Sequence, residues 1–385
     1  MEAVIVEAVR TPFGRRGGQL RHIRPDALLA HALDGLLERA GLPPDAVGDV
    51  QCGSVTQMGE QGANVGRLAL LLSKLPVDVP AMTLNRMCGS SQQALHGAAQ
   101  AVAAGDMAYA IGGGVESMSR VPMFSDIGGG FERLNPALHA RHELIHQGES
   151  AERIAERWGL SRTAIDDFSA ESHRRAVAAR PTAELLPTAG HDGEGAPITV
   201  RVDEGVREQI DPVAMAGLRP VFRSEGGVVT AGNSSQLSDG ASALLVGERS
   251  RVAADGLRAK ARFLARVVVG SDPTLQLMGV VPATREALRR AGLTMADLDW
   301  IEINEAFATV VLAWARELDA DMSRVNPWGG AIAHGHPLGA TGAGLMAKMV
   351  AGLEATDGTL GLQVMCIGHG MATATIIERL GGGVL

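Results

Sequence analysis

The sequence predicts an α/β protein made of two similar halves, layered αβαβα, with a loop-rich domain inserted between them. Short β-branched runs alternate with Ala- and Leu-rich runs at helical spacing, which is the pattern of sheets covered by helices. The stretch around Gly41 recurs around Gly292, so each half is expected to hold a mixed five-stranded sheet. A chain of 385 residues is also too long for one ordinary core, so two domains are expected.

The first elements follow from apolar spacing and from turn residues. Residues 4–9 form a β-branched run that predicts a strand. A helix is expected from about Pro25, because proline suits a first helical turn, and Gly41 is a suitable C-cap. A strand near residues 47–55 and a helix over about 63–74 come next.

The turn that begins at Asn85 is the first candidate for chemistry. It follows an extended run, residues 79–84, and precedes an Ala-rich helical stretch that ends near Ala104. Cys88 therefore lies at or just before a helix start, where free N–H groups and the helix dipole favour a thiolate. We expect Cys88 to be more acidic and more reactive than a free cysteine. The competing interpretation is a small buried thiol, which most lone cysteines are.

The repeat keeps one register over several elements. Gly41 and Gly292 lie 251 positions apart, each after a similar helical run. At that offset Cys88 matches Gly339, which again opens an Ala- and Gly-rich helical stretch. His336 then occupies the turn that corresponds to Asn85 in the first half.

The strand after the Cys88 helix also has a counterpart. It is expected over residues 107–111, with the glycines 112–114 at its end. With a few extra residues inserted, it matches a strand that ends at the glycine-rich stretch 368–370. The repeat therefore predicts two similar halves related by a pseudo-twofold axis. A site at their junction would draw its residues from equivalent loops of both halves.

A segment of different composition separates the halves. Residues 118–229 hold helices, long loops and many Pro and Gly residues, and they do not repeat, which is common for an element that covers a ligand. The chain is thus expected to divide into three parts. Residues 1–117 plus about 230–257 form the first half, residues 118–229 form the insertion, and residues 258–385 form the second half.

Composition excludes several classes of protein. The net charge is −8 without a basic block, so nothing points to nucleic acid. Apolar runs such as 68–72 are too short to span a bilayer, and the N-terminus is interpreted as a strand, not a signal peptide. The three cysteines, Cys52, Cys88 and Cys366, predict free thiols in a reducing compartment, the cytoplasm. No metal-ligand spacing is recognised.

Four stretches fall on strand-end or helix-start loops. Ligands of open α/β sheets bind where such loops converge. A cysteine nucleophile needs a base, usually histidine, and the pseudo-twofold axis can bring His336 next to Cys88. The stretches are the Cys88 turn, Asn304-Glu305-Ala306-Phe307-Ala308, the segment Gly329 to Gly339 with Gly335-His336-Pro337, and Cys366-Ile367-Gly368-His369-Gly370.

With these four motifs in this order, the chain resembles the thiolases from Val4 to about Leu380. The resemblance implies a thiolase-like duplicated fold and an acyltransferase of CoA and acetyl-CoA. The reaction would be thiolytic cleavage of a 3-oxoacyl-CoA or the reverse Claisen condensation. The resemblance also implies acyl-CoA substrates, no permanently bound cofactor, and a homodimer or homotetramer.

The resemblance assigns roles within the four motifs. Cys88 would carry the acyl group, His336 would accept its proton, and Cys366 would move the α-proton. One oxyanion would be held by His336 and a water positioned by Asn304. The other would be held by the backbone N–H groups of Cys88 and Gly368.

The resemblance extends to the coenzyme A contacts. Gln147 stands where short-chain biosynthetic thiolases have methionine, which favours a degradative thiolase of bulkier substrates over an acetoacetyl-CoA thiolase. The residues that match contact positions are Ser235 for pantetheine, Met278 and Phe307 for the pocket, Arg207 near the nucleotide, and His146 with Gln147.

Other interpretations stay open. A β-ketoacyl synthase shares the doubled fold but uses two histidines and lacks the late cysteine, Cys366. A non-catalytic acyl-CoA carrier would be expected to lose its nucleophile or base. His334 and His369 depart from the family pattern, either as tolerated loop variation or, for His369, to tune Cys366 or a substrate carbonyl.

Overall fold

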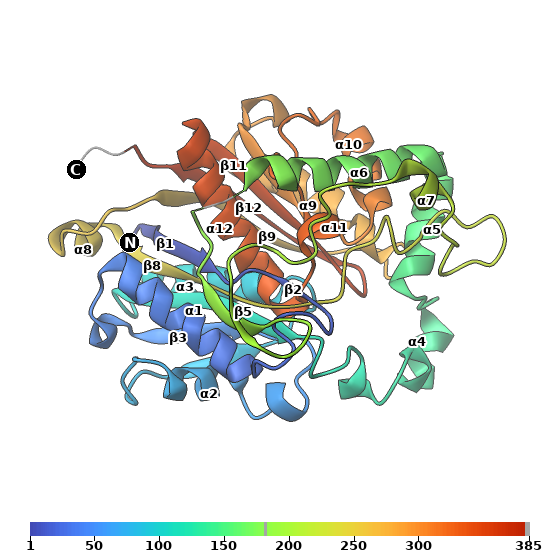
Figure 1. Ribbon diagram of the computed structural model, residues 1–385. Coiled ribbons are helices and arrows are strands. Elements are labelled where there is room, and N and C mark those ends of the chain that lie inside the picture. Colours follow the sequence, from blue (N-terminus) through green and yellow to red (C-terminus); the bar gives the residue numbers. More distant parts are fainter. Residues whose placement is uncertain (181–182, 382–385) are drawn as a thin grey trace.

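The computed structural model describes residues 1–180 and 183–381, and it has the expected layered α/β architecture (Figure 1). The first half contributes five neighbouring strands to the central sheet, the outer three of them parallel. In spatial order these strands are β4 (Ala81–Leu84), β3 (Asp49–Gly53), β5 (Tyr109–Ser117), β8 (Ser238–Glu248) and β1 (Ala3–Arg10). The two-residue strand β2 (Gly14–Arg15) pairs with the first residues of β8.

The second half continues the same sheet. β1 pairs with β9 at only two positions, so the two sets of strands meet along a narrow seam. From the seam outward the strands are β9 (Ala261–Gly270), β12 (Met371–Arg379), β11 (Leu360–Ile367) and β10 (Trp300–Ile303). A fifth strand was expected here. In its place Val325 forms an isolated bridge to Ile301, and the next residue, Asn326, has a left-handed φ of 44°.

Two helices lie between the two sets of strands. α3 (Ser90–Ala104) packs on β3, β5 and β8 and reaches β12 through Gln92, whose Nε2 donates to Thr375 Oγ1. α12 (Leu338–Thr356) packs against α3 and against strands of both halves. A buried apolar cluster joins both helices to β1, β5 and β8, so these helices form the middle layer.

Helices of the outer layers cover the two remaining faces. α1 (Pro25–Ala40) and α2 (Val65–Leu72) cover the first half, and α9 (Val280–Ala291) and α10 (Ala308–Leu318) cover the second. α1 begins with Pro25 in its first turn and ends at Gly41 with a φ of 68°, and α9 ends at Gly292 with the same φ. Glycine adopts this left-handed cap without a steric penalty. The predicted repeat of helix followed by strand is therefore present.

One detail of the predicted repeat is wrong. The glycines 112–114 do not end their strand but lie within β5, which starts 251 positions before β11 without extra residues. A Cβ on Gly112 would lie 2.5 Å from Leu95 Cα, and one on Gly114 would lie 2.2 Å from Gly339 O. The glycines thus let β5 approach both middle helices closely.

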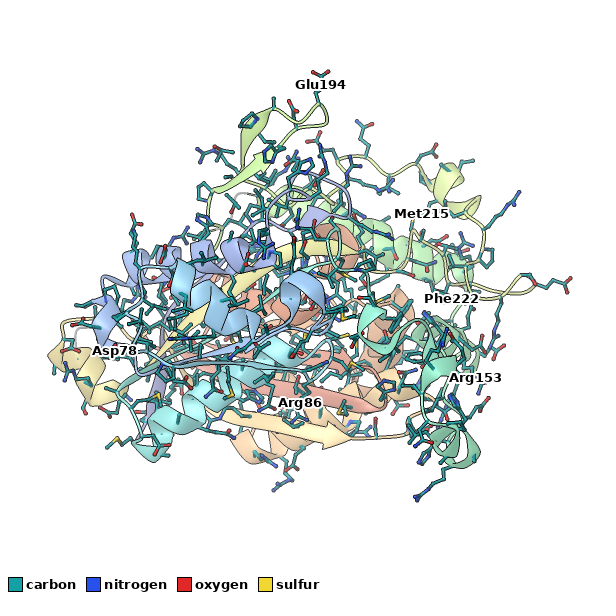
Figure 2. The ribbon with its side chains drawn as sticks, turned by 90° about the horizontal axis from the view of Figure 1, so that it is seen from below. Asp78, Arg86, Arg153, Glu194, Met215 and Phe222 are labelled. Atoms are coloured by element: carbon teal, nitrogen blue, oxygen red, sulfur yellow. The ribbon has the colours of Figure 1, made fainter. Side chains whose placement is uncertain are left out.

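The insertion lies beside both halves in Figure 1. It contains α4 (Pro136–Arg141), α5 (Gln147–Arg157), α6 (Arg162–Ala179), the hairpin of β6 (Thr188–His191) and β7 (Pro197–Val200), and α7 (Pro212–Ala216). Figure 2 shows Glu194 at the tip of that hairpin. The remaining helices are α8 (Arg249–Ala254) and the short α11 (Ala331–His334). Within the described ranges, no helix is both long and apolar enough to cross a bilayer.

Candidate active site

A cavity of about 220 Å³ opens where the two halves and the insertion meet. Cys88 of the first half and His336 of the second both line it. The insertion supplies much of the apolar wall, including Phe222, which Figure 2 labels. The other apolar side chains of the wall are Val55, Met87, Met118, Met123, Phe124, Ile127, Phe131, Leu134, Leu237, Ala306, Phe307 and Leu338.

Cys88 lies two residues before α3, in a turn that Met87 enters with a φ of 48°. Its thiol is buried, and burial raises the pKa of Cys88 to about 12. The backbone N–H groups of Cys88 and Gly368 face the sulfur and partly oppose this rise in pKa. The prediction that Cys88 is more acidic than a free cysteine is therefore wrong. Desolvation raises the pKa of the thiol by more than the N–H groups at the helix start lower it. The N–H groups of Cys88 and Gly368 are the two to which the resemblance assigns one oxyanion.

His336 is buried in the turn before α12, and a hydroxyl determines which of its nitrogens carries the proton. Its Nδ1 lies 2.6 Å from Thr341 Oγ1, and that hydroxyl donates its only proton to Pro337 O at 2.9 Å. Nδ1–H of His336 must therefore be the donor to Thr341, and Nε2 is left as an acceptor facing the site. Burial lowers the pKa of His336 to about 4, so the ring is neutral at pH 7.

Asn304 connects His336 with the second cysteine. It follows β10, and its Nδ2 lies 3.4 Å from His336 Nε2 and 3.6 Å from Cys366 Sγ. Asn304 Oδ1 is buried and has no hydrogen-bond partner within residues 1–180 and 183–381. An amide in this place can orient a proton donor beside His336 and Cys366.

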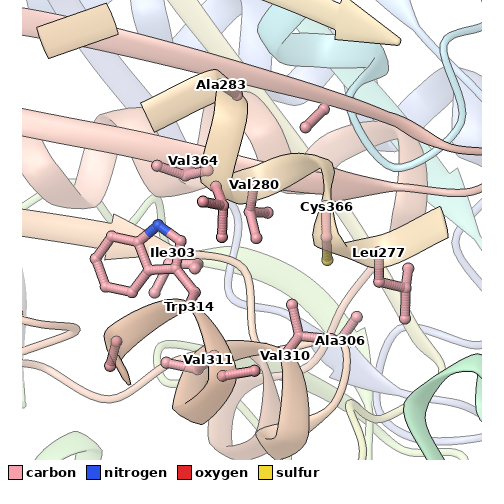
Figure 3. Packing of buried hydrophobic residues seen from close by; sticks show 14 of the residues in the cluster. Leu277, Val280, Ala283, Ile303, Ala306, Val310, Val311, Trp314, Val364 and Cys366 are labelled. Atoms are coloured by element: carbon pink, nitrogen blue, oxygen red, sulfur yellow. The ribbon is translucent and has the colours of Figure 1, made fainter. Parts of the chain in front are cut away.

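Cys366 is fully buried near the end of β11, among apolar side chains that include Leu277 and Ala306 (Figure 3). Burial raises the pKa of the Cys366 thiol to about 11, and hydrogen bonds from Asn304 and the Ala306 backbone oppose this rise. Cys366 is thus a neutral thiol that can give or take a proton in a dry environment.

The loop after β11 contains Gly368, whose backbone N–H group faces Cys88. His369 takes a left-handed conformation with a φ of 61°, and its N–H donates to Gln276 Oε1 at 2.8 Å. Its ring lines the cavity edge-on to Phe131, with the centroids 5.4 Å apart. His334 lies instead on a second cavity, with its Nε2 3.4 Å from Lys348 Nζ.

The whole chain is similar to known enzymes. Family profiles described as the N-terminal and the C-terminal domain of thiolase match residues 3–250 and 257–379. The chain belongs to the thiolase family. It is 45% identical over 387 residues to a 3-ketoacyl-CoA thiolase of Vibrio cholerae, covering 98% of this chain and 99% of the relative. It is 46% identical to the steroid 3-ketoacyl-CoA thiolase FadA6 of Mycobacterium tuberculosis, covering 98% and 94%.

Family membership confirms the predicted class of reaction. This thiolase is an acyltransferase that acts on CoA thioesters, by thiolytic cleavage or the reverse condensation, through an acylated cysteine. Thiolases use coenzyme A as a substrate without a permanently bound cofactor. No group of three or more His, Cys, Asp or Glu side chains in the described part of the chain is arranged to hold a metal ion.

The predicted coenzyme A positions fall into two groups. Ser235, Phe307, His146 and Gln147 line the cavity with Cys88. Arg207, which is exposed, and the half-buried Met278 are not among its lining residues.

Sequence reasoning missed three positioning side chains of this thiolase. Thr341 sets the tautomer of His336, and Gln276 holds the loop at His369. The buried carboxylate of Glu116 accepts hydrogen bonds from Val55 N, Thr56 N, Gln61 Nε2 and Gly339 N. The spacing of Thr341 five residues after His336, on the same helix start, was the one available signal.

We expect the rate at which acetyl-CoA acylates this thiolase to stay level from about pH 6 to about pH 9. A base works when unprotonated, so a pKa of His336 near 4 keeps it active well below the usual histidine range. A thiol pKa near 12 keeps Cys88 protonated throughout. Rapid quenching and mass spectrometry at single turnover measure this rate. A fall in rate centred near pH 6.5, the ordinary histidine pKa, would contradict the buried neutral pair.

Proposed function

We propose that this thiolase cleaves 3-oxoacyl-CoA esters, or forms them in reverse, with the acyl group carried on Cys88. The observation that carries the proposal is the link between the Cys88 cavity and Cys366. Cys88 and His336 line one cavity, and Asn304 joins His336 to Cys366. Cys88 approaches the Gly368 amide, so the attacked carbonyl has a donor ready for its oxygen.

In cleavage, His336 Nε2 takes the proton of Cys88 as the sulfur bonds to C3 of the 3-oxoacyl-CoA. The oxygen on C3 becomes an oxyanion near the N–H groups of Cys88 and Gly368. The C2–C3 bond then breaks, leaving the acyl group on Cys88 and the electron pair on the acetyl-CoA enolate. Protonated His336, with a water held by Asn304, stabilises the enolate oxygen.

Cys366 gives its proton to C2 of the enolate, and acetyl-CoA leaves. The thiol of free CoA then gives its proton to the Cys366 thiolate as its sulfur attacks the acyl group on Cys88. The bond from the acyl carbon to Cys88 breaks, the shortened acyl-CoA leaves, and His336 returns its proton to Cys88. Asn304 supports this role, because its Nδ2 donates toward Cys366 Sγ and stabilises the thiolate that forms. One thiol cannot serve both steps, since acylated sulfur has no proton to exchange.

The substrate proposed is an ester longer or bulkier than acetoacetyl-CoA. The wall of the cavity is mostly apolar and aromatic, which suits an acyl chain. Relatives named 3-ketoacyl-CoA thiolase and steroid 3-ketoacyl-CoA thiolase support this choice over a short-chain biosynthetic acetoacetyl-CoA thiolase. Similarity to enzymes over nearly the full length sets aside the synthase and the carrier.

The insertion, residues 118–229, is proposed to cover the mouth of the site and to contribute to coenzyme A binding. It supplies Met118, Phe124, Phe131, His146 and Gln147 to the cavity wall. Ser235 and Phe307 are proposed to contact the pantetheine arm or acyl group from the two halves. Arg207 and Met278 stay predictions for parts of coenzyme A outside this cavity.

We propose a homodimer or homotetramer in the cytoplasm. β4 is an edge strand of the sheet, and edge strands pair readily with another chain. Met82 on this strand is 43% exposed, and Leu71 and Leu72 at the end of α2 are 50% and 60% exposed. A second copy would cover this face. All three cysteines are free, in keeping with a reducing compartment.

Replacing each cysteine separately tests the division of roles. Cys88→Ala is expected to abolish covalent labelling by acetyl-CoA. Cys366→Ala is expected to take up one acetyl group but to lose condensation by about 10²–10⁴-fold, as general acid–base residues do. Intact-mass spectrometry and the enolate absorbance of acetoacetyl-CoA measure the two effects. Acetylation of Cys366 in place of Cys88, or full condensation activity in Cys366→Ala, would overturn the assignment.

A series of 3-oxoacyl-CoA esters tests the acyl group. We expect kcat/KM for CoA-dependent cleavage to rise from acetoacetyl-CoA to longer or ring-bearing esters, because each buried methylene contributes about 0.8 kcal/mol. Release of acetyl-CoA is measured for each ester at a fixed CoA concentration. The proposal of bulky substrates is wrong if acetoacetyl-CoA has the highest kcat/KM of the series.

A further inference from the structure

A glutamine of the insertion lies directly over the backbone donor that faces Cys88. A Cβ placed on Gly368 would lie 2.6 Å from Gln147 Nε2. The carboxamide of Gln147 therefore packs on Gly368, whose N–H group reaches the Cys88 sulfur. Gln147 also lines the cavity that holds Cys88.

The amide of Gln147 is not used in a hydrogen bond that stabilises the described part of the fold. Its side chain is half-buried and makes no hydrogen bond to any residue within 1–180 and 183–381. A polar group that loses its water without gaining a partner destabilises the complex. A bound substrate would exclude water here, so the amide needs a partner on the substrate.

The surrounding contacts hold Gln147 in this place before substrate binds. Gln147 begins α5, and His146 caps the helix by accepting from Gly148 N at 3.1 Å. Phe222 stacks on His146, with the ring centroids 4.9 Å apart. Gln276 donates to Ile145 O at 3.0 Å.

Gln276 hydrogen-bonds to the segments on both sides of the contact between Gln147 and Gly368. Its Oε1 accepts from His369 N at 2.8 Å, next to Gly368, while its Nε2 holds the residue two before Gln147. Gln276 is itself 2% exposed, so this clamp is shielded from water. The distance between the Gln147 amide and the Gly368 N–H group is thus preset, as donors aimed at a developing charge require.

We propose that Gln147 Nε2 is a third hydrogen-bond donor to the carbonyl oxygen of the acyl group on Cys88. This inference rests on the proposed acylation of Cys88. The oxygen that the N–H groups of Cys88 and Gly368 bind is the polar substrate atom nearest to Gly368. Gln147 donates to it while keeping its own proton, and the bond strengthens as the oxygen becomes an oxyanion. Gln147 is therefore a catalytic residue, not only part of the pocket wall.

The test uses Gln147→Met, which keeps the size of the side chain and removes the donor. Gln100→Met makes the same change on the exposed side of α3 and is the control. We expect Gln147→Met to slow acylation of Cys88 by acetyl-CoA on the order of ten-fold. That is below the ~10²–10³-fold typical of losing an oxyanion donor, because two backbone donors remain. KM for acetyl-CoA should change little.

A vibrational readout separates donation from packing. Cys366→Ala, which cannot condense the acyl group, is loaded with acetyl-CoA labelled with ¹³C at the carbonyl. Isotope-edited infrared spectroscopy then reads the C=O stretch, which hydrogen-bond donors lower. Adding Gln147→Met should raise this frequency, and adding Gln100→Met should leave it unchanged.

The outcomes are distinguishable from failure of the proposed function. If no acyl group forms on Cys88 in the Cys366→Ala parent, the acyl-enzyme proposal itself fails. If the acyl group forms, and adding Gln147→Met changes neither its carbonyl frequency nor the acylation rate, only the role of Gln147 is overturned.

Discussion

The geometry of this site depends on one buried carboxylate that ties the two halves together. Glu116, at the end of β5, accepts from Val55 N and Thr56 N of the first half and from Gly339 N of the second. Val55 O in turn accepts from Asn85 Nδ2, at the start of the Cys88 turn. Gly339 follows His336 in the first turn of α12. Glu116 therefore sets the placement of Cys88 relative to His336.

Burial of the two cysteines and of His336 determines their charge before the reaction begins. Desolvation raises the pKa of Cys88 and of Cys366 and lowers that of His336, so the resting groups are uncharged. Charge then arises only during reaction, at atoms that fixed donors already face. The N–H groups of Cys88 and Gly368 serve one oxyanion, and the Nε2 side of His336 with Asn304 serves the other. Thr341 makes this possible by keeping Nε2 unprotonated until Cys88 gives up its proton.

The sequence predicted the doubled fold because its signals are local. Helix caps at Gly41 and Gly292 and the motifs around Cys88 and His336 depend on neighbours in the chain. The glycines 112–114 were misread as a strand end, since their reason is the approach of α3 and α12 from far along the sequence. The roles of Glu116 and Gln276 were missed for the same reason, since their hydrogen-bond partners lie up to 223 residues away in the sequence.

The central claim is that residues of both halves converge on one acyl group. A crystal structure of Cys366→Ala after brief soaking with acetyl-CoA tests it most directly. We expect an acetyl group on Cys88 Sγ, with its oxygen within hydrogen-bond distance of Cys88 N and Gly368 N and with His336 Nε2 on the opposite side. An acetyl group on another residue, or one on Cys88 with its oxygen turned away from Gly368, would contradict the account.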